Sequence, residues 1–120
     1  MILMIDTTDR NKIELGLFDG KVLRCFEFET RRQSEDLLSA IDGILKNEHL
    51  SKKDLKGILI NQGPGSFTGI RVGVTTANTL AWIFNIPIFG YQENNLEQSL
   101  YKLSKYQDRK FFKPIIPYYN

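Results

Sequence analysis

The order in which two hydrophobic periods follow each other constrains this fold more than any other feature of the sequence. Residues 12–18 and 21–30 alternate apolar and polar side chains as strands do, and Asp19–Gly20 between them is a strong hairpin signal. From residue 34 to 46 the apolar side chains recur at helical spacing instead, at Leu37, Leu38, Ile41, Ile44 and Leu45. Ser34 is the expected N-cap of this helix.

The remaining elements predict a mixed sheet. Short apolar runs typical of buried strands occur at residues 1–6, 55–61 and 87–91. A strand, a helix and a parallel strand require right-handed crossovers, so three antiparallel strands should be followed by two parallel ones. We therefore expect an α/β fold, a five-stranded mixed sheet flanked by helices. This is the ribonuclease-H-like layout, which is also one half of the actin-like ATPases, and it does not fix function.

Composition bounds the class of protein. The 120 residues argue for a single domain, and the net charge of +2 is too small to imply nucleic-acid binding by itself. A lone cysteine, Cys25, excludes an internal disulfide and fits a reducing compartment, so we expect a cytoplasmic protein. The longest uncharged stretch, residues 72–92, holds several polar side chains and Pro87, which argues against a membrane span.

The glycine-rich stretch at residues 61–73 is the main candidate site. It lacks the Lys-Ser/Thr pair of a phosphate-binding loop and the G-x-G-x-x-G of a dinucleotide fingerprint. Two readings remain, a loop that approaches a ligand and a tight strand-to-helix turn in which Ser66 or Thr68 caps the helix; capping is favoured. The candidate contacts to a ligand or partner are Gly63, Pro64, Gly65, Ser66, Phe67, Thr68, Gly69 and Arg71.

The helix after this loop should run from about Gly69 or Ile70 to Phe84. No charge follows Arg71 until Glu93, so the helix has no obvious wet face and should be covered on two sides. Small residues recur at every fourth position, at Gly69, Gly73, Ala77 and Ala81. On a helix they form one smooth edge that another backbone can approach closely. We interpret this edge as a contact with a second protein, which Gly73→Leu or Ala77→Glu should break.

Three other features suggest chemistry only weakly. Asp6 ends the first strand, where ribonuclease-H-like nucleases bind Mg²⁺, but Asn61 and Gln62 stand where a second carboxylate is needed. Asp6 is better read as the cap of a turn, and His49 as a structural residue at a helix end. Basic and aromatic residues alternate in the expected helix at residues 94–106 and the tail beyond it, which we read as a solvated face more readily than a tRNA contact.

The motifs "MILMIDTT", "RRQSEDLLSAI" and "GPGSFTGIR", with the small-residue helix and "IPIFG" after them, resemble the TsaB (YeaZ-type) family. These proteins act in the bacterial synthesis of threonylcarbamoyladenosine on tRNA, and the resemblance covers residues 1 to about 100. It implies a non-catalytic subunit without metal or cofactor. The subunit pairs with the catalytic homologue TsaD, and the ATPase TsaE docks on that pair. The contact helices correspond to residues 34–46 and the helix after Gly69, with Leu38, Ile41 and Leu45 at the interface.

This chain departs from the family in two ways. The family's second actin-like domain is missing, so residues 1–120 are expected to form one N-terminal domain without an interdomain nucleotide cleft. Gln33 stands where a histidine is common. We therefore expect a scaffold subunit that binds and activates TsaD, forms a homodimer when alone, and meets tRNA only indirectly and no membrane. The alternatives are an autonomous actin-like nucleotide-binding enzyme and, less favoured, a ribonuclease-H-like nuclease.

Overall fold

The computed structural model describes residues 1–92, 95, 96, 98 and 100. Most of the expected helix at residues 94–106, and all of the basic tail after it, lie outside these residues. The elements are β1 (Ile2–Asp6), β2 (Lys12–Phe18), β3 (Leu23–Glu29), α1 (Gln33–Asn47), the single 3₁₀ turn η1 (Lys52–Asp54), β4 (Gly57–Asn61), α2 (Phe67–Phe84) and β5 (Ile88–Tyr91).

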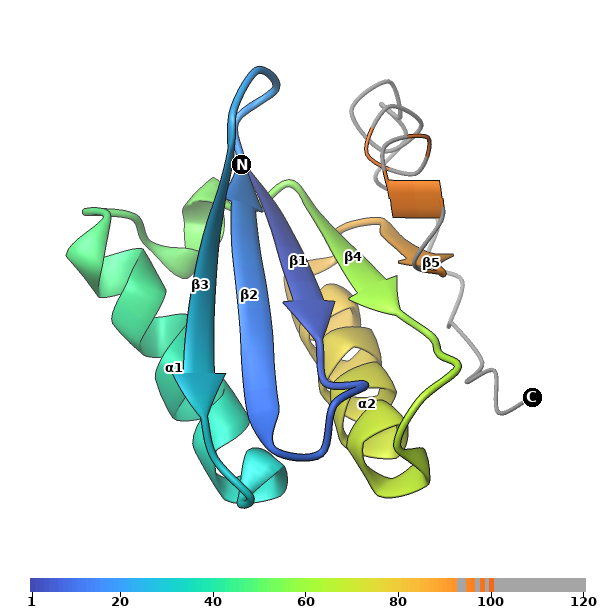
Figure 1. Ribbon diagram of the computed structural model, residues 1–120. Helices are drawn as coiled ribbons and strands as arrows, with labels where there is room; N and C mark the ends of the chain where they lie inside the picture. The colour runs from blue at the N-terminus through green and yellow to red at the C-terminus, as the bar shows by residue number, and fades with distance from the viewer. Residues whose placement is uncertain (93–94, 97, 99, 101–120) are drawn as a thin grey trace.

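The five strands form one sheet in the order β3-β2-β1-β4-β5 (Figure 1). β1, β2 and β3 pair antiparallel, whereas β4 lies parallel to β1 and β5 parallel to β4. This is the sheet that the sequence predicted. Parallel neighbours need crossovers, and the two helices supply them.

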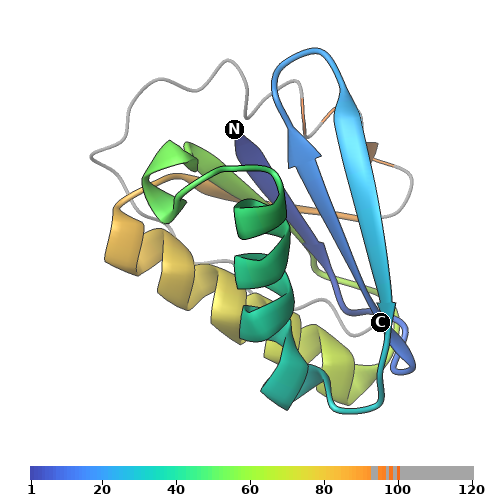
Figure 2. The same ribbon diagram turned by 90° about the vertical axis from the view of Figure 1, so that its left-hand side faces the viewer.

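Both helices cover the same face of the sheet, where α1 and α2 cross (Figure 2). The main core lies between the sheet and these helices and includes the inward side chains of β1, β2 and β4. A smaller apolar cluster on the opposite face joins Ile2, Met4, Leu59, Tyr91 and Leu100. Within the described part of the chain, no helix combines the length and apolar character needed to cross a membrane.

The β2–β3 hairpin forms as predicted, at Asp19–Gly20. One carboxylate oxygen of Asp19 accepts hydrogen bonds from the backbone N–H groups of Lys21 at 2.8 Å and Val22 at 2.9 Å. These donors, Val22 first, lower the pKa of the Asp19 carboxyl below its ordinary value. Gly20 has φ +103°, a left-handed conformation that favours glycine.

Both helices begin earlier than the sequence suggested. α1 starts at Gln33 after Arg32, so the expected N-cap Ser34 lies inside the helix. The Thr30 hydroxyl organises this start instead, because it accepts from the Arg32 N–H at 2.9 Å and donates to Asp36 at 2.6 Å. α2 starts at Phe67 and not at Gly69 or Ile70, because the Ser66 hydroxyl caps it by accepting from the Gly69 N–H at 3.2 Å.

The orientation of α2 corrects the predicted role of its small-residue edge. This edge faces the chain's own sheet, and all four of its residues, Gly69, Gly73, Ala77 and Ala81, are buried. A Cβ on Gly73 would collide with the Thr7 hydroxyl and approach Ile60 at 3.2 Å. The close approach inferred from the small side chains is real, but the partner is the sheet. Gly73→Leu and Ala77→Glu would therefore disrupt the fold itself.

Candidate functional site

The glycine loop closes on the turn that follows β1. The Ser66 N–H donates to the carbonyl of Thr8 at 2.7 Å, and the buried Thr7 hydroxyl donates to the carbonyl of Gly69 at 2.6 Å. A Cβ on Gly65 would lie 2.6 Å from the Cβ of Thr8, and one on Gly69 would overlap the Thr7 carbonyl oxygen. Glycine is required at both positions because two backbone segments touch there.

This packing favours the turn over the phosphate cradle. Residues Thr7 and Thr8 fill the space beside Gly65 and Gly69, where a Cβ would collide with them. The predicted capping role of Ser66 is confirmed by its bond to the Gly69 N–H. Gly63 has φ +105° and precedes a cis peptide bond to Pro64. The side chains of this loop that remain at the surface are those of Pro64, Phe67 and Thr68.

Gln33 ties the start of α1 to the same turn. Its side-chain amide donates to the backbone carbonyls of Asp9 at 2.7 Å, Lys12 at 2.9 Å and Thr7 at 3.3 Å. The side chain is buried, so these bonds satisfy a polar group that would otherwise be costly. The residue that departs from the family pattern thus has a structural role, which is to hold the β1–β2 turn against the helix.

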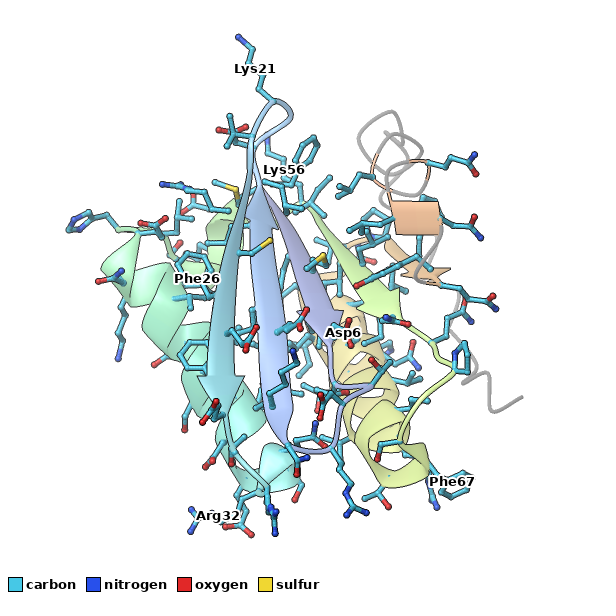
Figure 3. All side chains as sticks on the ribbon, viewed as in Figure 1. Asp6, Lys21, Phe26, Arg32, Lys56 and Phe67 are labelled. Atoms are coloured by element: carbon cyan, nitrogen blue, oxygen red, sulfur yellow. The ribbon has the colours of Figure 1, made fainter. Side chains whose placement is uncertain are left out.

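Asp6 caps the turn after β1, as the sequence predicted. Its Oδ1 atom accepts from the Thr8 N–H at 2.9 Å and the Thr8 hydroxyl at 2.7 Å. Its Oδ2 atom accepts from the Asn61 amide at 3.1 Å, so both oxygens bond within the chain. Burial, with the Asp6 carboxylate nearby, raises the pKa of the Tyr91 hydroxyl far above its ordinary value. Figure 3 labels Asp6 at the end of β1.

Among the residues that the structure describes, no three His, Cys, Asp or Glu side chains gather as a metal site would require. His49 is exposed just beyond α1, with φ +59°, and Cys25 is an exposed strand residue as predicted. The described residues therefore offer hydrogen-bonding groups at the glycine loop but no cluster of metal-ligating side chains.

The outward faces of α1 and α2 form the most unusual surface of the described chain. Large apolar side chains are exposed to solvent there: Trp82 is 69% exposed, Ile83 57%, Leu38 57% and Phe67 55%. Between the helices lies a hollow of about 400 Å³ whose lining includes Ser34, Thr68, Val72 and Thr75. We call this region the helix surface. Of the interface residues predicted on α1, Leu38 lies on it, whereas Ile41 and Leu45 are buried in the core.

Arg71 is the one charged residue of α2, and it belongs to the helix surface. Its guanidinium lies 5.7 Å from the centre of the Phe67 ring, within cation–π range. Within the described residues it forms no ion pair: Glu35 pairs with Arg32, and Asp6 accepts from the Asn61 amide. Phe67 projects from the start of α2, away from the sheet (Figure 3).

Sequence reasoning missed Trp82 and Ile83 as site residues. Both stand in an uninterrupted apolar stretch, and helical spacing alone does not say which face of such a helix turns outward. The signal that could have revealed it is steric. The small residues at every fourth position let α2 lie close to the sheet, so the bulky Trp82 and Ile83, which lie off that edge, point away from it.

The fold and the site define an α/β domain of the ribonuclease-H-like class, with a closed glycine turn and an open helix surface. The sequence model of the family described as "TsaD: tRNA N6-adenosine threonylcarbamoyltransferase" matches residues 27–119. The chain belongs to this family.

The curated relatives confirm the resemblance to TsaB proteins. The chain is 36% identical over 88 residues to the "tRNA threonylcarbamoyladenosine biosynthesis protein TsaB" of Bacillus subtilis, a match that covers 72% of this chain and 38% of that protein. It is 36% identical over 90 residues to the Escherichia coli protein of the same name, with 74% and 38% covered. The matches thus span well under half the length of these relatives.

Solved structures support the fold. A Pseudomonas aeruginosa protein described as similar to the peptidase YeaZ superposes with a TM-score of 0.72 at 21% identity, covering 84% of this chain and 47% of that one. RuvC of Thermus thermophilus, in complex with a Holliday junction substrate, gives a TM-score of 0.53 at 10% identity, covering 82% and 70%. At these identities the likeness establishes the ribonuclease-H-like fold alone.

Proposed function

We propose that this chain is a non-catalytic scaffold subunit in the synthesis of threonylcarbamoyladenosine on tRNA. It binds the catalytic TsaD homologue through α1 and α2 and holds it in its active arrangement. The observation that carries the proposal is the helix surface, where Trp82, Ile83 and Leu38 are each more than half exposed. Large apolar side chains that are exposed on a small domain mark a candidate interaction site.

Homology to the catalytic protein supports this choice of partner. The chain is 34% identical over 64 residues to a tRNA N6-adenosine threonylcarbamoyltransferase of Listeria monocytogenes. Two homologous subunits carry corresponding helices, which can pair about a pseudo-twofold axis as the two copies of a symmetric dimer do. Trp82 fits the centre of such a contact, because tryptophan is enriched among residues that dominate binding.

The rest of the proposal follows from this pairing. Without the transferase, two copies of the chain pair through the same helix surface, since an isologous contact covers the same residues. A TsaE-type ATPase binds the heterodimer and not this chain alone, and tRNA is bound by the complex in the cytoplasm. Residues 1–120 supply one N-terminal actin-like domain, which matches less than half the length of the curated TsaB proteins.

The test is threonylcarbamoyl transfer to tRNA by the TsaD-type transferase of the same organism, with and without this chain. We expect product formation to rise at least tenfold when the chain is added. Trp82→Glu and Leu38→Glu should abolish the stimulation, because each places a charge in a desolvated apolar contact. Lys56→Gln, at an exposed position outside the helix surface, is the matched control and should stimulate normally.

Two results would overturn the proposal. One is equal product formation with and without the chain. The other is transfer by the chain alone, which would make it the catalyst and not the scaffold.

A further inference from the structure

Among the described residues, β3 forms one edge of the sheet and pairs with no strand on its outer side. In the β2–β3 register, Leu17 lies opposite Arg24 and Leu15 lies opposite Phe26. The Asp19 N–H donates to the Val22 carbonyl at the hairpin, and the Thr30 N–H donates to the Asn11 carbonyl at the far end. Counting every second pair between these two bonds makes Leu17–Arg24 and Leu15–Phe26 hydrogen-bonded pairs. Because bonded pairs alternate in an antiparallel ladder, the backbone groups turned away from β2 are those of Leu23, Cys25, Glu27 and Glu29.

An apolar groove accompanies this free edge. It has a volume of about 390 Å³ and runs between β3 and α1, lined by Phe26 and Phe28 on one side and by Ala40, Gly43 and Ile44 on the other. Phe26 projects toward α1 (Figure 3). Gly43 leaves the groove open, since a Cβ built there meets nothing within 4 Å.

Polar links close the groove at both ends. Arg24 Nη1 lies 2.8 Å from Glu48 Oε1 beyond the end of α1, and the Thr30 hydroxyl donates to Asp36 at the start of α1. The apolar part therefore spans only Phe26 and Phe28 on the strand. Its length suits two or three side chains of an extended segment, projecting at every second position.

The opposite face of the same edge is acidic. Glu14, Glu27 and Glu29 lie there with Lys12, whose ammonium is 3.0 Å from Glu14 and 3.7 Å from Glu27. Three carboxylates and one ammonium leave a formal charge of −2 on this face. A strand added to the edge would thus meet apolar groove walls with one set of side chains and carboxylates with the other.

We infer that the β3 edge and its groove bind an extended segment of another protein, in which basic and apolar residues alternate. The segment adds a sixth strand to the sheet. Its backbone bonds the free groups of Cys25 and Glu27, its apolar side chains enter the groove beside Phe26 and Phe28, and its basic side chains meet Glu27 and Glu29. Strand addition of this kind derives affinity from the backbone and specificity from the pockets.

Charge argues against a second copy of the chain as the occupant. Two β3 edges in antiparallel pairing would bring the carboxylates of Glu27 and Glu29 from both copies onto one face. Like charges in cross-strand neighbours are destabilising. A basic segment removes this repulsion and adds attraction.

The probe is the peptide acetyl-Lys-Leu-Lys-Val-Lys-Leu-Lys-amide, titrated into the full chain. We expect binding at least tenfold tighter than for the same peptide with glutamate in place of lysine. With the peptide antiparallel to β3, N-methylation of the inner lysine amides should abolish binding, because these N–H groups bond β3, whereas N-methylation of the leucine and valine amides should be tolerated. In hydrogen exchange, the amides of Cys25 and Glu27 should gain protection, and those of Phe26 and Phe28, already bonded to β2, should not.

Two variants and a control test the site. Gly43→Leu fills the groove without a backbone collision and should weaken binding at least tenfold. Glu27→Lys combined with Glu29→Lys should reverse the preference toward the glutamate peptide. Lys56→Gln, at an exposed position outside both the groove and the helix surface, is the control and should bind as the unaltered chain does.

The inference is overturned if the lysine peptide does not bind, if Gly43→Leu binds it equally well, or if the amides of Cys25 and Glu27 gain no protection. It is also overturned if those amides are already protected from hydrogen exchange in the free chain and the free chain has the mass of two copies. The edge would then be an interface between copies.

Discussion

At the residue scale, the contact between Thr7 and Gly69 explains why the glycine loop has its composition. The two residues are 62 positions apart, and the Thr7 hydroxyl bonds the Gly69 carbonyl while the backbones touch. Glycine thus serves here to bring α2 onto β1. The loop resembles a phosphate-binding loop in composition because both need close backbone approach.

Gly69→Ala should destabilise the fold, because the new Cβ overlaps the Thr7 carbonyl and a backbone must shift. We expect a loss of about 1–3 kcal/mol in the free energy of unfolding, as for other overpacked positions. The matched control is Gly43→Ala, which adds the same methyl group to open space on α1. It should stabilise by about 0.5–1 kcal/mol, since alanine favours helix. Urea denaturation measures both, and equal effects would contradict the assigned packing.

Asp19 should make the stability of the hairpin depend on pH. Its pKa is lowered in the folded chain by the N–H groups of Val22 and Lys21, so its contribution is present above the unfolded pKa of about 3.9 and is lost as pH falls through the folded value. Asp19→Asn should therefore lower the free energy of unfolding at pH 7 and have little effect near pH 2. Denaturation curves at both pH values test this. A penalty independent of pH would show that the charge is not responsible.

At the element scale, α2 shows which parts of the structure were predictable from sequence. The strands and the hairpin followed from local patterns, since alternation and the Asp19–Gly20 turn each act within a few residues. The orientation of α2 did not, because the helix carries no charge after Arg71 and its hydrophobic pattern lacks contrast. Its orientation depends on contacts with Thr7 and Ile60, which are distant in sequence.

The site was predictable to a similar extent. Ser66 and Asp6 act locally as caps, and both roles could be read from the residue types beside them. Leu38 was predicted at a protein interface and is exposed on the helix surface, whereas the exposure of Trp82 and Ile83 follows from the packing of α2 on the sheet. The Gln33 side chain donates hydrogen bonds to backbone carbonyls of the β1–β2 turn, which is distant in sequence, so no local sequence motif predicts these bonds.

The orientation of α2 makes a prediction about the helix itself. Trp82→Gln should change the free energy of unfolding by no more than about 0.5 kcal/mol, because the side chain is 69% exposed. Ala77→Val adds two methyl groups to a buried position and should cost about 1–3 kcal/mol. Thermal and urea unfolding distinguish the two variants. The reverse order of effects would mean that the helix is turned the other way.

At the scale of the whole molecule, one sheet separates surfaces of different character. The helix surface is apolar and carries Arg71 as the one charge of α2, whereas the outer face of the β2–β3 edge is acidic. A domain of this size can present both, because α1 and α2 lie on the same face of the sheet (Figure 2). Binding at one surface leaves the other free.

The most direct test of the scaffold account is the molecular mass of this chain mixed with the TsaD-type transferase of the same organism, measured by light scattering after gel filtration. The account predicts a one-to-one complex with the summed mass for the unaltered chain and for Lys56→Gln. For Trp82→Glu it predicts two separate species. Two separate species for the unaltered chain, or an undiminished complex with Trp82→Glu, would contradict it.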